Sequence, residues 1–141
     1  MHLLDQDLPG VAQRLETLTP EARARLLAAA CRFMAAELRE QDFQVAALLD
    51  ELSRGKGAGG QARAARLAEE ADGKYFDLQE AGAEEREWMR WFSRARLLSG
   101  IATSFAAVTA SDAADALYEL AHVVDDPTSL LAFVEGKLAG G

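Results

Sequence analysis

LLSGIATSFAAVTAS, residues 97–111, carries no charge over fifteen consecutive positions in a chain of which 27% is charged. Because charged side chains are rarely buried, an uncharged run of this length is expected at the centre of the fold. The run is shorter than the roughly 20 residues that a helix needs to cross a bilayer, and it contains Ser99, Thr103 and Ser104. We therefore expect a buried core helix, and we expect no membrane partner.

The composition favours helix throughout the chain. The sequence has 29 alanines and 20 leucines, whereas valine, isoleucine and threonine together number 12. Alanine and leucine are the strongest helix formers, and the β-branched residues that favour strands are scarce. A chain of 141 residues is long enough to bury roughly two thirds of the surface that its unfolded form exposes. These properties predict an all-α protein.

Helix-start and helix-stop signals divide the chain into about six or seven helices. Thr19 followed by Pro20 is a strong start signal, because proline needs no donor at the first helical position. The other expected N-terminal caps are Asp7, Asp42, Ser111 and Asp126. Helix breaks are expected at Gly82 and in the glycine-rich loop 53–60, and a weakening of the helix is expected at Asp72–Gly73. We predict a single all-helical domain over residues 1–141, in which a bundle of about six or seven helices surrounds a buried central helix near 84–109.

Acidic residues gather in two parts of the chain, whose net charge is −8. Residues 69–87 contain eight acidic residues against two basic ones, and residues 112–135 contain six acidic residues and none that is basic, so each stretch carries −6. Potential of this sign attracts a cationic partner and repels nucleic acid. Aromatic anchors flanked by acids complete the candidate partner-binding set, which is Glu69, Glu70, Asp72, Tyr75, Phe76, Asp77, Asp115, Tyr118, Glu119, Asp125 and Asp126.

A polar stripe within 112–135 supplies an alternative function. Glu119 and His122 form a Glu-x-x-His step, which is half of the ligand set in ferritin-like di-iron bundles. The second step is missing, because the only other histidine is His2. The alternative is therefore a helical bundle that binds a metal ion or a small ligand, and its candidate ligands are Asp115, Glu119, His122 and Asp125, with Tyr118 on the same stripe. The leading interpretation requires no cofactor.

Two other motifs are interpreted as structural. Gly55, Gly57 and Gly60 match G-x-G-x-x-G, but a helix precedes them where a dinucleotide site needs a strand. A pair of tryptophans, Trp88 and Trp91, lies beside an arginine ridge, as in single-strand nucleic-acid sites. The surrounding negative charge argues against nucleic acid, so we expect core tryptophans and arginines paired with Glu87 and its neighbours. The ridge consists of Arg86, Arg90 and Arg94.

No catalytic constellation is recognisable, and the protein is not expected to be an enzyme. The single cysteine, Cys31, lies on an apolar helical stripe, where burial would raise the pKa of its thiol and make it a poor nucleophile. One cysteine cannot close an intramolecular disulfide, and the first ten residues lack the basic and apolar regions of a signal peptide. A cytoplasmic location is therefore expected.

The leading hypothesis is an acidic protein-binding module that masks a basic protein surface. Bacterial immunity proteins and similar inhibitors are small acidic helical proteins that cover the active site of a toxin. The comparison with them is one of composition only, because no motif in this chain identifies a family. A third interpretation is a scaffold subunit that associates with itself as a homo-oligomer.

Overall fold

The computed structural model describes residues 10–55, 59–124 and 126–140. These residues form seven helices and no strand, so the predicted all-helical fold is confirmed. No helix in this part of the chain combines the length and the apolar character that a membrane crossing requires. In chain order the helices are α1 (Val11–Glu16), α2 (Pro20–Glu37), α3 (Phe43–Ser53), α4 (Gly60–Glu80), α5 (Glu85–Ala106), α6 (Ala110–Ala121) and α7 (Thr128–Gly140).

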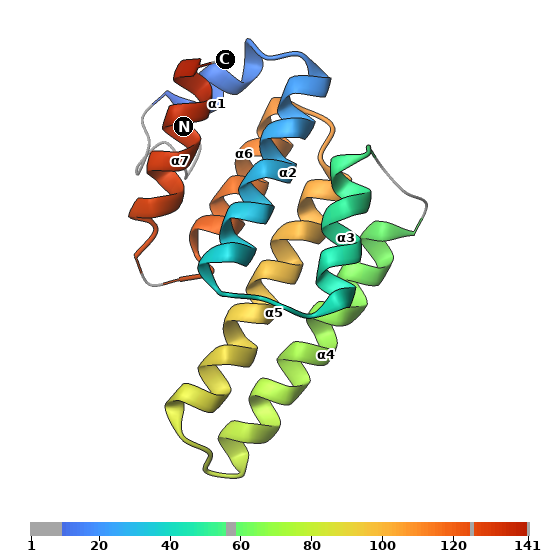
Figure 1. Cartoon of the computed structure of the whole chain (residues 1–141), viewed down its shortest axis with the longest axis vertical. Helices are drawn as coiled ribbons and strands as arrows, with labels where there is room; N and C mark the ends of the chain where they lie inside the picture. Colours follow the sequence, from blue (N-terminus) through green and yellow to red (C-terminus); the bar gives the residue numbers. More distant parts are fainter. Residues whose placement is uncertain (1–9, 56–58, 125, 141) are drawn as a thin grey trace.

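Helix α5 lies at the centre of the bundle, where it packs against α2, α3, α4 and α6 (Figure 1). The uncharged stretch supplies the buried part of this helix, and Leu97, Leu98 and Ile101 are almost fully shielded from solvent. Complete burial of one such aliphatic side chain contributes about 1.5–3 kcal/mol to folding. The expected central helix is present, but its burial is concentrated in the C-terminal half, since most of residues 85–94 are exposed or half-buried.

Small residues determine how closely the neighbouring helices approach α5. Ala64, Ala68 and Ala71 line the buried face of α4, as their spacing predicts. On α5, a Cβ atom added at Gly100 would lie 2.6 Å from Cδ2 of Leu120 in α6. A carbon–carbon distance that short requires a shift of the side chain or of the helix. Gly100 therefore permits the observed separation of α5 and α6.

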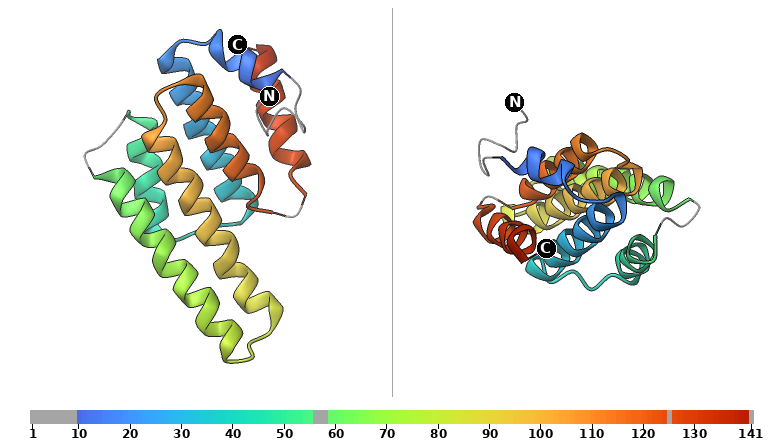
Figure 2. Two further views of the ribbon diagram at one scale, coloured as in Figure 1. Left: turned by 180° about the vertical axis from the view of Figure 1, so that it is seen from behind. Right: turned by 90° about the horizontal axis from the view of Figure 1, so that it is seen from above.

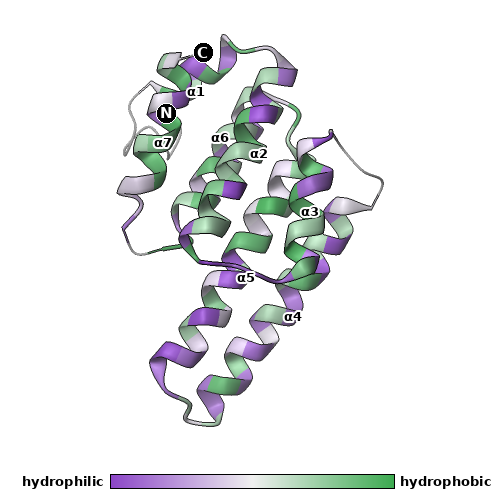
Figure 3. Cartoon of the chain, viewed as in Figure 1, coloured by the Kyte–Doolittle hydropathy of each residue, from purple (hydrophilic) through white to green (hydrophobic). Residues whose placement is uncertain are grey.

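Beyond the bundle, α4 and α5 continue together as a two-helix arm, defined here as residues 69–92 (Figure 1; Figure 2). Many of its residues are hydrophilic (Figure 3). The arm is held together by rings: the Tyr75 ring centroid lies 5.6 Å from that of Trp88 and 5.2 Å from that of Phe92. Gly82, with φ +75°, forms the expected break at its tip. Because only two helices pack there, each keeps an exposed face.

One expected helix boundary, the cap of α6, is wrong, and another lies outside the described residues. Helix α4 runs through Gly73 without a break, because an interior glycine costs only about 1 kcal/mol and the flanking turns pack on α5. Helix α6 is capped by Thr109 and not by Ser111. The Thr109 hydroxyl accepts the N–H of Asp112, and the Asp112 carboxylate accepts the N–H of Thr109 in return. The expected cap Asp7 is not among the described residues.

The connection between α2 and α3 is fixed by a left-handed residue. Arg39 has φ +56° and occupies the position after the helix end that glycine usually takes. The N–H of Arg39 donates to the carbonyl of Ala36 at 3.0 Å, and the N–H of Glu40 donates to the carbonyl of Ala35 at 2.9 Å. This turn directs the chain across α5 and places Glu40 against it. The expected cap Asp42 then starts α3 by accepting the N–H of Gln44.

The loop expected at 53–60 connects α3 to α4. Its described glycines Gly55 and Gly59 have φ values of +83° and +84°, which residues with a side chain rarely adopt. Gly57 lies outside the described residues. Helix α3 leads into this segment and no strand precedes it, so the context that the dinucleotide motif requires is absent from the described chain.

We predict opposite effects for two glycine-to-alanine substitutions within helices. Gly100→Ala should lower the free energy of unfolding by about 1–3 kcal/mol, because the added methyl group overlaps Leu120. Gly73→Ala should raise it by about 0.5–1 kcal/mol, because nothing lies within 4 Å of the added atom and alanine favours helix. Urea titration followed by circular dichroism measures both changes. Equal effects of the two substitutions would contradict the proposed close approach of α6 to α5.

Candidate interaction surface

The acidic residues of the arm are all exposed to solvent. In the described part of the chain, the ion pairs are Arg14–Glu135, Arg32–Asp50, Arg63–Glu51 and Arg94–Glu40, and none of them uses a carboxylate from residues 69–87. These carboxylates therefore have no close ion pair with a cation among the described residues. The exposed acids are Glu69, Glu70, Asp72, Asp77, Glu80, Glu84, Glu85 and Glu87.

The two aromatic candidates on the arm have different environments. Tyr75 is half-buried among the rings of Phe76, Trp88 and Phe92, so it holds the two helices of the arm together. Phe76 is 58% exposed and is one of three large apolar side chains at the surface of the described chain. Of the two, Phe76 is the side chain that a partner can reach. Packing against Tyr75, at 4.9 Å between ring centroids, restrains its position.

The second acidic stretch uses several of its carboxylates within the protein. Backbone N–H groups of Thr109 and Val108 donate to Asp112 and hold the pKa of its carboxyl below the usual value. The hydroxyl and the backbone N–H of Thr128 donate to Asp126 and lower its pKa likewise. Both carboxylates therefore stabilise helix starts. As candidate partner contacts, they are less available than the acids of the arm.

The remaining acids of that stretch are also less available than those of the arm. Glu135 pairs with Arg14 at 2.8 Å and so connects α7 to α1. Glu119 is half-buried, and Asp115 is exposed but also has an interaction partner. The candidate Asp125 lies outside the described residues. The structure thus distinguishes two stretches that have the same net charge in the sequence.

Tyr118 and His122 come together at the end of α6, as their spacing predicts. Their ring centroids are 4.3 Å apart, and Nδ1 of His122 lies 2.8 Å from the carbonyl oxygen of Tyr118. Because the carbonyl can only accept, Nδ1 carries the proton and Nε2 is the ring nitrogen left to bind a ligand. Within the described ranges, no three histidine, cysteine or acidic side chains come close enough to hold a metal ion. No observation in this region favours the metal-binding alternative.

The arginine ridge and the tryptophans meet at the base of the arm. The guanidinium of Arg94 lies 4.7 Å from the Trp91 ring centroid, and the Lys74 ammonium lies 6.0 Å from it. Arg94 also binds Glu40 through two contacts, Nε to Oε2 at 3.1 Å and Nη2 to Oε1 at 2.8 Å. The expected partner of this arginine was Glu87 or one of its neighbours, whereas the observed partner comes from the α2–α3 connection. Trp91 is half-buried against the core.

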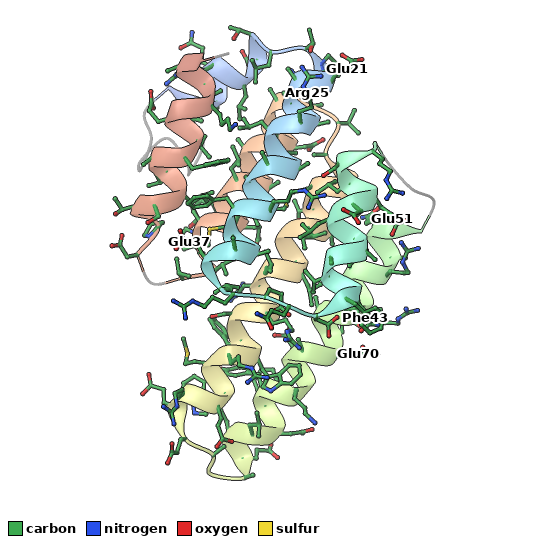
Figure 4. All side chains as sticks on the ribbon, in the orientation of Figure 1. Glu21, Arg25, Glu37, Phe43, Glu51 and Glu70 are labelled. Carbon is green, nitrogen blue, oxygen red and sulfur yellow. The ribbon has the colours of Figure 1, made fainter. Side chains whose placement is uncertain are left out.

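Two features of this region are not among those predicted from the sequence: the buried carboxylate of Glu40 and the exposed ring of Phe43. The side chain of Glu40 is 7% exposed, and that of its partner Arg94 is 20% exposed, so this ion pair is the least exposed in the described chain. Phe43 is 80% exposed at the start of α3 (Figure 4). Its exposure has a signal in the sequence, because Phe43 lies off the apolar stripe. That stripe is Val45, Leu48, Leu49 and Leu52.

Cys31 is buried, as predicted from the apolar stripe around it. Desolvation raises the pKa of its thiol to about 12, while a contact with Ser104 opposes the shift. The Sγ atom lies 3.5 Å from the Ser104 hydroxyl, which itself donates to the carbonyl of Gly100 at 2.8 Å. The thiol is therefore the donor to Ser104. A neutral thiol without access to solvent acts as a packing group and not as a nucleophile.

No family model matches the chain, and no curated protein or solved structure matches it either.

We predict that the Glu40–Arg94 pair contributes more to stability than an exposed pair of the same kind. Glu40→Gln should lower the free energy of unfolding by about 1–3 kcal/mol, because it leaves a largely buried guanidinium without its counter-charge. The matched control is Asp50→Asn, which removes the exposed pair with Arg32 and should cost about 1 kcal/mol or less. Chemical denaturation measures both values. A Glu40→Gln cost no larger than that of the control would contradict the assignment.

Proposed function

We propose that this protein is a binding module for a basic protein surface, and that its α4–α5 arm makes the contact. The observation that carries the proposal is the set of exposed carboxylates on residues 69–87, none of which is paired with a cation in the described chain. Charged groups without internal partners raise the rate at which an oppositely charged protein arrives.

The arm also offers an apolar contact in the middle of its charges. Phe76 is exposed between acidic residues, and Tyr75 beneath it is fixed by Trp88 and Phe92. Affinity at protein interfaces is concentrated in a few aromatic or arginine anchors, whereas surrounding charges improve specificity and association rate. In the proposed complex, Phe76 is the anchor and the carboxylates orient the partner.

The role that this arrangement fits is masking. A protein that covers a cationic site, such as the substrate-binding surface of a toxin that acts on nucleic acid, must present rigid negative charge and needs no chemistry of its own. We therefore propose that the protein is an inhibitor of the immunity type and is not an enzyme. Its proposed location is the cytoplasm. The stretch 112–135 is the weaker candidate for the contact, because Asp112, Asp126 and Glu135 stabilise helix ends or pair with Arg14.

Neutralising the arm should weaken capture of a basic partner. The test variant carries Glu69→Gln, Asp72→Asn and Asp77→Asn, and the control carries Glu16→Gln, Glu21→Gln and Glu37→Gln, which are exposed on α1 and α2 and change the net charge equally. Both are used beside the wild type as baits in a lysate of the source cells, and any captured protein is purified. We expect its association rate with the test variant to fall about 10-fold or more at low salt, and to change little with the control.

Salt provides the second readout of the same experiment. Association with the wild type should slow steeply as ionic strength rises, because screening shortens the reach of exposed charges. Equal losses for the two triple variants would show that only net charge matters. Rates that are insensitive to salt would contradict recognition by the arm.

A further inference from the structure

Two hollows adjoin one another where α3 begins against α4 and α5. The apolar hollow has a volume of about 250 Å³, and its apolar wall is formed by Val45, Leu67, Ala71, Trp91 and Leu98. The polar hollow, of about 490 Å³, lies along the α2–α3 connection and is lined by Arg39 and Arg90 among others. Asp42 and Arg94 line both. The two hollows therefore adjoin one another at these two residues, one with an apolar wall and the other with exposed guanidinium groups.

Two of the three carboxylates that line the hollows are already engaged, and the third, Glu70, lies on the apolar hollow together with Lys74. Glu40 is paired with Arg94, and Asp42 accepts the backbone N–H that starts α3. By contrast, neither Arg39 nor Arg90 has an ion-pair partner among the described residues, and both are exposed. Two guanidinium groups without ion-pair partners therefore line the polar hollow of a chain whose net charge is −8. They offer planar donors of the kind that bind carboxylate, sulfonate and phosphate groups.

The apolar hollow has the size for a ring or a short alkyl chain. An apolar protein cavity of about 150 Å³ holds benzene, so about 250 Å³ accommodates a larger body. Trp91 supplies an aromatic wall, and the contacts of Arg94 and Lys74 with its ring hold that wall in place. Phe43, next to the lining residues Asp42 and Gln44 in the sequence, is exposed at the start of α3 (Figure 4).

We propose that the two hollows are a binding site for a small organic anion, whose apolar body lies against Trp91 while its acidic group meets Arg39 and Arg90. This site adjoins the acidic contact surface of the arm, because Glu70 and Lys74 also line the apolar hollow. The proposal does not depend on the proposed function. The ligand of this site has the opposite charge to the partner that the arm attracts. The pairing of Arg94 with Glu40 keeps the boundary between the apolar and cationic parts rigid.

The probe for this site is 1-anilinonaphthalene-8-sulfonate, which combines aromatic rings with one sulfonate. Binding is followed by calorimetry and by energy transfer from tryptophan to the probe in a Trp88→Phe variant, in which Trp91 is the sole donor. We expect a dissociation constant on the order of 10–100 μM, which the usual efficiency of ligands of this size gives. Arg39→Gln with Arg90→Gln should weaken binding at least about 10-fold, since both contacts to the sulfonate are lost.

The chain offers a matched control for this double variant. A separate hollow between α2 and α7 has an apolar wall that includes Leu26 and Leu138, and Arg25 and Lys137 also line it. Arg25→Gln with Lys137→Gln removes the same charge from that hollow. The dissociation constant of the probe should then stay within about 2-fold of the wild-type value, since only the long-range electrostatic potential changes. Circular dichroism checks that both double variants are folded.

Three results would overturn the proposal. One is loss of binding in the Arg25 and Lys137 variant with retention in the Arg39 and Arg90 variant, which would place the probe in the other hollow. Another is binding that neither variant changes, which would mean that the sulfonate meets neither cationic hollow. The third is equal affinity of the uncharged parent compound N-phenyl-1-naphthylamine, which would remove the role assigned to the arginines. Binding of the anion weakened only at Arg39 and Arg90 supports the site.

Discussion

The structure depends on the continuity of α5 between two different environments. Its C-terminal half packs tightly in the bundle, where Gly100 permits the close approach of α6 and buried leucines fill the core. Its N-terminal half has only α4 as a neighbour over most of its length and therefore leaves charged residues exposed. Because both halves belong to one helix, the core orients the arm. The ring cluster around Tyr75 and the Glu40–Arg94 pair restrain the arm further.

That arrangement separates the charges of the protein into those that hold the fold and those that face outward. Asp112 and Asp126 accept backbone donors at helix starts, and Glu40 pairs with Arg94 between elements. The acids of the arm have no such task in the described chain. A surface carboxylate without an ion-pair partner remains hydrated at little cost in free energy. Neighbouring carboxylates repel one another, and a bound cationic partner relieves this repulsion. The same net charge therefore has different consequences on α6 and on the arm.

The sequence predicts the helices and their buried faces better than it predicts which side chains pair at the surface. Periodicity and capping residues predicted the helical class, the buried central helix and the alanine face of α4, because each depends on neighbours within one or two turns. The weakening expected at Asp72–Gly73 does not interrupt α4, since packing on α5 overrides the local preference of glycine. Thr109 caps α6 in place of the expected Ser111, and the reciprocal bonds with Asp112 distinguish the two positions. Glu40 could not be paired with Arg94 in advance, as 54 positions separate them.

The most direct test of recognition by the arm is to map where a basic partner contacts the surface of this protein. Backbone amide signals from nuclear magnetic resonance, recorded as the purified partner is added, report which residues change environment. We expect the signal changes to concentrate on residues 69–87, with the change at Phe76 among the largest. The signals of α6 and of the start of α7 should be little affected. Changes concentrated at Asp115, Glu119 and Asp126, with the arm unaltered, would contradict this expectation.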